Sequence, residues 1–493
     1  MSSLSRETAR ERAREITVTG YDVALDLTGD SARHFRSVTT IRFESATGAT
    51  TFVDVAPHEI GTARLNGEPL DPAGLDRATR RLPLRPGAGS NELVVDAVMT
   101  YSHDGEGLHR HVDPADGRTY LYAMSFLDAA PRWFACFDQP DLKAPVRLTV
   151  DCPPDWVVAG NGPARPLGPG RWEIVSAGPL ATYFTTLVAG PYHALREVHD
   201  GIPLTLLARQ SLAQHLDRDR EELFAHTRQA LDGLHELFGV RYPWGEYVQA
   251  FVPEFNAGAM ENPGCVTLRD PLVFRSQVTD AERRDRAMVI THEAAHMWFG
   301  DLVTMRWWDD LWLNESFAEY LGYRVVGDRG WVSFGARRKS WGYAADRRPS
   351  THPVAGNGAA DAASALTEFD GISYAKGASV LRQLAAHLGD DLFLAGLRAY
   401  IVGHAGGNAE LADLLAAWRA AGARDPGYDT LHADGDQLRR ETPNGAGRPH
   451  AIAVTAYGAD GTALATRPVA VTADRTALDL PAAPLVLPDS GDE

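Results

Sequence analysis

A change in hydrophobic periodicity between residues 195 and 211 constrains the fold of this chain more than any other feature. Residues 16–195 contain short alternating runs such as YDVALDL, TTIRF and TFVDV, separated by Gly, Pro and Asp. Alternation of this kind is typical of antiparallel strands joined by turns. From Ser211 onward the apolar residues recur with the period of a helix. The sequence therefore predicts an antiparallel β domain followed by a helix-rich domain.

Start and stop signals predict where the long helices lie. The helical pattern that opens at Ser211 stops at Gly239, a residue type favoured just after a helix end. Thr279 and Glu282 have the spacing of a capping box, so a second helix should begin there and continue to Gly300. Further helices are expected over residues 314–327, 373–389 and 409–422.

A third pattern begins after Gly422, where short alternating runs such as HAIAVTAY and RPVAVTA return. At 493 residues the chain exceeds the size of one compact core, so several domains are expected. We predict an N-terminal β domain over residues 1–195, an α/β domain rich in helices over residues 196–425, and a small C-terminal β-sandwich-like module over residues 426–493.

Composition excludes several classes of protein. The formal net charge is −17 and basic residues do not cluster, so a nucleic-acid partner is not expected. No apolar run approaches the roughly 20 residues that span a bilayer, so no membrane partner is expected either. The N-terminus lacks the apolar core of a secretory signal, and the three cysteines are too scattered for a disulfide framework. These features predict a cytoplasmic protein.

The segment THEAAHMWFGD places His292 and His296 one helical turn apart, on one face of the second predicted helix. Glu293 could then touch a water on an ion held by the two rings. Two histidines can reach this spacing by accident, and a hydrolytic zinc site needs a third protein ligand. Glu315 follows His296 after 18 intervening residues and could supply that ligand from the next helix. The pattern favours a zinc site.

Together with GAMEN at 258–262, HEAAH and the glutamate of NESFAEY resemble the zinc aminopeptidases of the aminopeptidase N type, whose leukotriene-hydrolase relatives share the site. Further similar segments are GLHRHVDPADGRTYLY, FACFDQPDLKAP and ISYAKGASVL, so the resemblance covers residues 16–420. It implies a β-saddle N-terminal domain and a thermolysin-like catalytic domain. The implied function is a zinc metallopeptidase with one Zn²⁺ per chain and a peptide substrate.

The resemblance also implies roles for single residues. Zinc would be bound by His292, His296 and Glu315, with Glu293 as the general base. Tyr374 would stabilise the tetrahedral oxyanion. The implied substrate-binding residues are Gly258 and Ala259, which would pair with the peptide backbone, Met260 beside them, and Glu261, which would hold the free ammonium.

Glu319 lies one helical turn after Glu315 and has two interpretations. Its carboxylate could accept the remaining ring N–H of a zinc histidine and so fix the tautomer of that histidine. It could equally be a solvated surface acid, as most glutamates are. The sequence leaves this choice open.

The sequence departs from the family pattern in two places. Where the family has a Gln-x-Glu element whose glutamate is a second anchor for the substrate amine, an ungapped count places Met124 and Phe126. A phenyl ring cannot pair with a cation, so the preference for a free N-terminus should weaken and internal cleavage becomes conceivable. Both side chains could instead simply pack in a domain interface. The large C-terminal helical domain of long family members is also expected to be missing, which should open the cleft to longer peptides.

With these two departures, the sequence resembles short aminopeptidase N-like proteins that remove leader peptides from class III lanthipeptides. A modified precursor peptide is therefore one expected substrate. The alternatives are a conventional cytosolic aminopeptidase of broad specificity, an epoxide or ester hydrolase on the same site, and a non-catalytic peptide binder. Glu293 and Tyr374 argue against a binder, which needs neither. Another divalent ion could also replace zinc, because geometry and availability select the metal as much as ligand type does.

Overall fold

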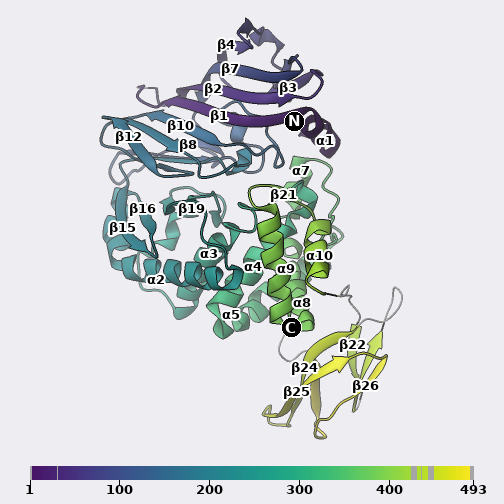
Figure 1. Cartoon of the computed structure of the whole chain (residues 1–493). Helices are drawn as coiled ribbons and strands as arrows, with labels where there is room; N and C mark the ends of the chain where they lie inside the picture. Colours follow the sequence, from purple (N-terminus) through teal and green to yellow (C-terminus); the bar gives the residue numbers. More distant parts are fainter. Residues whose placement is uncertain (1–2, 30, 424–429, 435, 442–448, 489–493) are drawn as a thin grey trace.

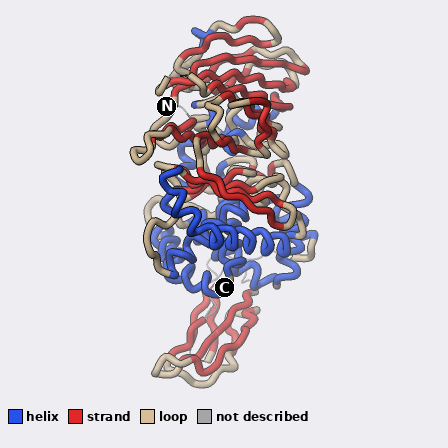
Figure 2. The backbone as a smooth tube through the Cα atoms, turned by 90° about the vertical axis from the view of Figure 1, so that its left-hand side faces the viewer, coloured by secondary structure: helices blue, strands red, loops and turns tan. Residues whose placement is uncertain are grey.

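The computed structural model describes residues 3–29, 31–423, 430–434, 436–441 and 449–488. Sheets form the upper part of the molecule, helices dominate the middle, and a small group of strands projects below them (Figure 1). The same order of red sheets, blue helices and a separate red β region is seen after a 90° turn (Figure 2). A sheet-rich N-terminal domain is therefore followed by a helical domain, as the two periodicities predicted.

The N-terminal domain is built on an eight-stranded sheet that follows α1 (Arg6–Glu15). Buried and exposed residues alternate along its long strands because one face packs on the core. The strand order is β12 (Ala164–Gly168), β13 (Arg171–Val175), β10 (Val146–Asp151), β1 (Ile16–Asp26), β2 (His34–Ser45), β7 (Gly89–Thr100), β4 (Glu59–Leu65) and β5 (Glu68–Pro69). A four-stranded sheet consists of β11 (Val157–Gly160), β14 (Leu187–Gly190), β9 (Thr119–Met124) and β8 (Gly107–Val112). The strands β3 (Thr51–Asp54) and β6 (Arg81–Leu84) form a separate two-stranded sheet.

A five-stranded sheet opens the next part of the chain. Its order is β15 (His193–His199), β16 (Ile202–Ala208), β17 (Tyr247–Val252), β19 (Cys265–Arg269) and β18 (Ala259–Met260). The long helix α2 (Ala213–Phe238) connects β16 to its parallel neighbour β17. This helix ends as predicted, since Gly239 adopts a left-handed conformation with φ 66°.

Helix α3 (Asp280–His296) begins with the predicted capping box of Thr279 and Glu282. It ends at His296, so the prediction that it continues to Gly300 is wrong. Gly300 has a φ of 124°, and a Cβ there would lie 3.2 Å from His296 Nδ1, so the chain turns back close against the histidine ring. The remaining helices are α4 (Trp312–Val326), α5 (Asp328–Ser333), α6 (Lys339–Asp346), α7 (Ala362–Ala365), α8 (Gly377–Leu388), α9 (Asp390–His404) and α10 (Leu411–Ala420), with the short pair β20 (Thr304–Met305) and β21 (Asn408–Ala409).

Strands return at the end of the chain, in two three-stranded sheets. One contains β22 (Thr430–Asp434), β23 (Gln437–Glu441) and β26 (Arg475–Ala477), and the other β25 (Ala463–Val471), β24 (His450–Tyr457) and β27 (Leu485–Pro488). They enclose a small core of their own around Leu438, Val454 and Val471. Parts of the predicted module 426–493 lie outside the described residues. No helix in the described ranges has both the length and the apolar character to cross a membrane.

Candidate metal site and substrate cleft

Helices α3 and α4 pack together and bring three potential ligands to one point. His292 Nε2 and His296 Nε2, from the last turn of α3, lie 3.1 Å apart. Glu315 Oε2, from the first turn of α4, lies 3.4 Å from each of these nitrogens. Zinc with ligands at about 2.0–2.1 Å in tetrahedral geometry requires ligand separations of about 3.3 Å. The three atoms therefore have the spacing that a zinc ion needs.

The proton positions on His296 also suit a metal. Its Nδ1 donates a hydrogen bond to the carbonyl oxygen of Phe299 at 3.0 Å. A neutral ring that donates from Nδ1 carries a lone pair on Nε2, which is the atom that faces His292 and Glu315. A lone pair aimed at two other ligand atoms in a buried site fits a cation between them.

Glu293 lies beside this group, with Glu261 close by. Glu261, Glu293 and His296 offer ligand atoms within 4.8 Å of one another, and all three residues are buried. Oε2 of Glu293 is buried without a hydrogen-bond partner among the described atoms. Burial raises the pKa of Glu293 well above its usual value, against the opposing effect of His296. A carboxyl with a raised pKa next to a metal site suits a group that takes up and releases a proton.

Glu319 is buried, so the interpretation as a solvated surface acid is wrong. Its two oxygens accept hydrogen bonds from Nε of Arg338 at 2.5 Å and Nη2 at 3.0 Å. The carboxylate also lies 3.6 Å from Nδ1 of His292. Arg338 belongs to a π-helical turn, η7 (Phe334–Arg338), and no pattern in the sequence links it to Glu319. Glu319 is thus held between an arginine and a candidate metal ligand.

Tyr374 covers the site from a second π-helical turn, η9 (Ile372–Lys376), just before α8. Its ring stacks on that of His292 with centroids 6.0 Å apart and an angle of 13°. Burial first, and the charge of Glu315 second, raise the pKa of this phenol well above its ordinary value. Tyr374 therefore stays protonated and can donate a hydrogen bond. Single-turn π segments of this kind are frequent at functional sites.

The GAMEN segment forms the edge next to the metal site. β18, which contains Ala259 and Met260, is the terminal strand of the five-stranded sheet and pairs with β19 on one side. In the described part of the chain, no strand pairs with its other side. This free edge could therefore pair with an extended peptide. Gly258 and Ala259 line a cavity of about 570 Å³ together with His292, Glu293 and Tyr374. Met260 and Glu261 are buried behind this edge.

Met124 and Phe126 lie on the other side of Tyr374, in a second cavity of about 840 Å³. Phe126 packs edge-on against three rings, those of Tyr183, Trp308 and Phe369, with centroids 4.9–5.9 Å apart. Met124 is buried. Both residues therefore pack at the junction of the two domains and also line a cavity, so the two interpretations of these positions do not exclude one another.

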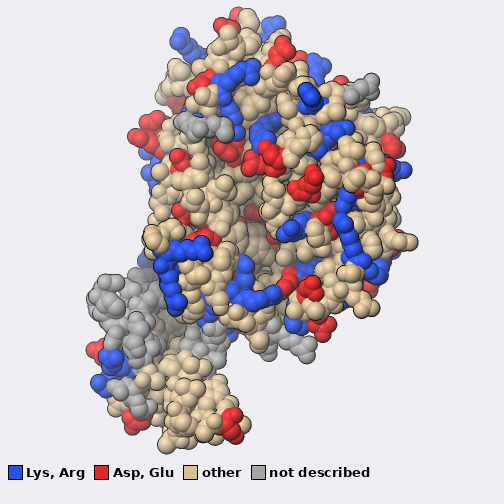
Figure 3. Space-filling view, turned by 180° about the vertical axis from the view of Figure 1, so that it is seen from behind, with Lys and Arg blue, Asp and Glu red and all other residues tan. Residues whose placement is uncertain are grey.

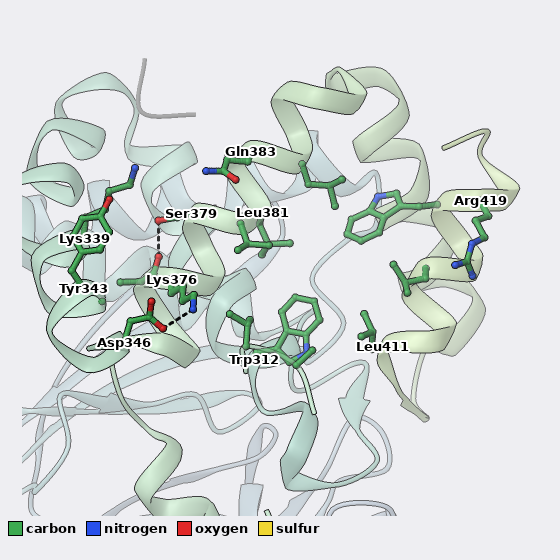
Figure 4. Close-up of a pocket in the computed structure, with 18 residues that line it drawn as sticks. Trp312, Lys339, Tyr343, Asp346, Lys376, Ser379, Leu381, Gln383, Leu411 and Arg419 are labelled. Atoms are coloured by element: carbon green, nitrogen blue, oxygen red, sulfur yellow. Dashed lines mark hydrogen bonds and ion pairs between the residues drawn. The ribbon is translucent and has the colours of Figure 1, made fainter. Parts of the chain in front are cut away.

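A third cavity, of about 980 Å³, lies between α6, α8 and α10 (Figure 4). Its walls are mostly apolar, and Lys376 Nζ forms an ion pair with Asp346 at 2.6 Å on one side. It shares the element that carries Tyr374 but contains none of the three candidate ligands. This larger cavity is therefore not the candidate active site.

The helical domain carries HExxH and a downstream glutamate and follows a sheet-rich domain, an arrangement that resembles the HExxH metallopeptidases. Comparison with known proteins adds a family match: residues 223–426 match the peptidase family M1 domain. It is 43% identical over 523 residues to aminopeptidase N of Streptomyces lividans, covering 97% of this chain and 60% of that protein. It is 36% identical over 344 residues to aminopeptidase M1 of Arabidopsis thaliana, covering 66% and 37% of the two chains. Tricorn protease-interacting factor F2 of Thermoplasma acidophilum is 32% identical over 293 residues, with 58% and 36% covered. The chain thus spans about 36–60% of the length of these relatives.

Proposed function

We propose that the protein is a zinc-dependent metallopeptidase that removes N-terminal residues from peptides. The observation that supports this most directly is the set of three donor atoms 3.1–3.4 Å apart, one of them on a histidine whose other nitrogen donates to Phe299. The names of the aminopeptidases with which the chain aligns support the same reaction class. Bound zinc would lower the pKa of a water and polarise the scissile carbonyl.

The chain's own residues supply the other parts of the reaction. Glu293 takes the proton of the attacking water and delivers it to the leaving amine, a role that its raised pKa suits. Tyr374, kept protonated, donates to the carbonyl oxygen as negative charge develops there. The free edge of β18 holds the peptide backbone. Glu261, buried beside Glu293 and His296, holds the substrate ammonium. The substrate residues before the cleaved bond lie on the side of Met124 and Phe126, the positions to which the resemblance assigns a second amine anchor.

The test is Glu293→Gln, which keeps the side-chain shape but cannot accept the proton. We expect metal binding to be retained and kcat on an aminoacyl arylamide to fall by about 10³-fold, within the range that general base removal produces. Glu236→Gln, at an exposed position on α2, is the matched control and should change neither metal binding nor kcat. A chelator should abolish the wild-type rate and added Zn²⁺ should restore it. An active Glu293→Gln protein would contradict the assignment.

Internal cleavage is the second candidate, because the side chain at the position of a second amine anchor is the phenyl ring of Phe126, packed among aromatic rings. Without a second carboxylate there, an amide can occupy the place of the ammonium at a smaller cost. Removal of the leader of a ribosomally made peptide such as a lanthipeptide remains a prediction from the sequence. No described residue favours an epoxide or ester hydrolase.

A further inference from the structure

The two cavities at the candidate active site adjoin each other. The cavity of about 570 Å³ contains His292 and Glu293, and the cavity of about 840 Å³ contains Phe126. Ala257 and Tyr374 line both. The second cavity therefore lies directly beside the metal site, next to Tyr374. Figure 3 shows the surface hollowed between the sheet-rich and helical parts, with acidic side chains above the hollow and basic ones below it.

Apolar side chains form most of the wall of the second cavity. Phe126 and Phe369 pack together with ring centroids 4.9 Å apart. Phe255 and Leu127 add buried apolar surface, and Leu366 lines the cavity while 59% of its surface is exposed. An exposed leucine next to a row of aromatic rings provides apolar surface that a peptide side chain can cover.

The charged groups of this cavity do not balance. It is lined by three carboxylates, Asp104, Glu106 and Asp128, and by two guanidinium groups, those of Arg80 and Arg132. Arg80 pairs with Asp128, whereas Arg132 is shared between Asp104 and Glu106. One net negative charge remains on the lining, and the carboxylate side chains are 42–60% exposed. The rim should therefore attract a cationic side chain and repel an acidic one.

The walls are fixed by contacts between distant parts of the chain. Glu254 Oε2 lies 3.1 Å from His109 Nε2 and 3.2 Å from His111 Nδ1, which ties the loop before β18 to β8. On the opposite wall, Ala363 N donates to Ser3 Oγ at 3.0 Å, which joins α7 to the start of the chain. The cavity is therefore a built feature of the junction between the domains, present before a substrate arrives.

We propose that this cavity is an extended subsite for substrate residues on the amino-terminal side of the cleaved bond. It would bind an apolar side chain against Phe126 and Phe369 and prefer a basic to an acidic residue further along. The inference rests on the proposed peptidase function and on its orientation of the substrate. It deepens that function by naming the substrate class as an internal polypeptide segment with apolar and basic residues before the cleavage point.

The first experiment varies substrate length on one side only. The full chain with bound zinc is incubated with acetylated peptides that carry one, two, three or four residues before a fixed scissile bond, and products are identified by mass spectrometry. We expect kcat/KM to rise with each added residue and to be higher for lysine than for glutamate in the distal positions. A rate that is independent of upstream length, or that responds only to downstream length, would overturn the proposal.

The second experiment changes the wall. Leu366→Asp places a charge on the apolar surface, and Leu167→Asp makes the same change at an exposed position on β12 outside the cavity. For each variant we compare kcat/KM for the longest acetylated peptide with kcat/KM for a short unblocked substrate. We expect the ratio of the two to fall by about tenfold in Leu366→Asp only. Equal ratios in both variants would count against the subsite.

The two proposals fail in distinguishable ways. If no peptide is cleaved in a chelator-sensitive manner, the proposed peptidase function itself is wrong. If a short unblocked peptide is cleaved but every acetylated peptide is left intact, the peptidase function stands and the extended subsite is wrong.

Discussion

Among the described residues, two groups of side chains that share no residue each bring three potential metal ligands within 4.8 Å of one another. One group is His292, His296 and Glu315, and the other is Asp200, Asp232 and His235. The first lies inside the helical domain with side-chain exposures of 1–13%. In the second, Asp200 and Asp232 lie on the surface with 46% and 57% of their side chains exposed. Clusters of potential ligand atoms therefore occur in very different surroundings.

The hydrogen bonds of the two groups differ more than the distances do. His235 Nε2 accepts a hydrogen bond from the backbone N–H of Tyr242 at 3.0 Å, so a neutral ring carries its proton on Nδ1, the atom near Asp200. Asp200 is also paired with Arg241. Each potential ligand of the surface group is therefore engaged elsewhere, since Asp232 also lies 2.7 Å from Nε2 of His199. In the buried group, by contrast, the three potential ligand atoms face one another. Protonation and competing partners, and not proximity alone, separate a candidate metal site from a charged surface.

The largest expected effect tests this contrast directly. His296→Ala removes one of the three converging donors, and we expect the purified protein to lose its bound zinc and all chelator-sensitive activity. His235→Ala removes a histidine from the surface group and should leave the metal content unchanged. Metal analysis of both variants after dialysis measures the difference, and equal zinc loss in the two would remove the distinction between the groups.

A smaller effect concerns the support of the metal ligands. Glu319→Gln removes the charge that lies between Arg338 and His292, and loss of such an outer partner typically lowers metal affinity by about 10–100-fold. Asp390→Asn is the matched control, because it breaks an equivalent carboxylate pair with Arg324 on the exposed side of the same helix. Competition with a chromogenic chelator measures both affinities. Similar affinities in the two variants would show that Glu319 acts only on stability.

The smallest effect is a pH dependence of stability at the surface group. Burial first, and the charge of Arg241 second, lower the pKa of His235 from 6.5 in the folded protein. The unfolded chain therefore binds more protons below about pH 6.5, so the stability supplied by this group is present above that pH and is lost as the pH falls. The variant His235→Gln keeps a hydrogen-bond acceptor but does not titrate. Between pH 7 and pH 5, the free energy of unfolding of the wild type should therefore fall relative to that of this variant.

The expected change is below about 1 kcal/mol because solvent screens a partly exposed ring. Urea unfolding of both proteins at the two pH values measures it. A difference that stays constant with pH would mean that His235 has the same pKa in both states.

The local predictions succeeded where short-range chemistry decides the structure. The capping box at Thr279 and the left-handed Gly239 are confirmed, because each depends on backbone groups within a few residues. The predicted end of α3 was wrong by four residues, because the chain turns at Gly300 and packs against His296. Helix propensity carries no information about this contact. Arg338 was missed for the same reason, as its partner Glu319 lies on another helix.

By itself the sequence determined the order of sheet-rich and helical domains and the residue types at the candidate metal site. Periodicity and an i, i+4 pair of histidines are properties of one segment, so they can be recognised without knowing how the rest of the chain folds. Only the tertiary structure decided that Glu319 is buried, that Tyr374 stacks on His292, and that a second cavity lined by Phe126 adjoins the cleft. Those facts depend on how separate domains pack, where the free energy comes from contacts between residues far apart in the chain.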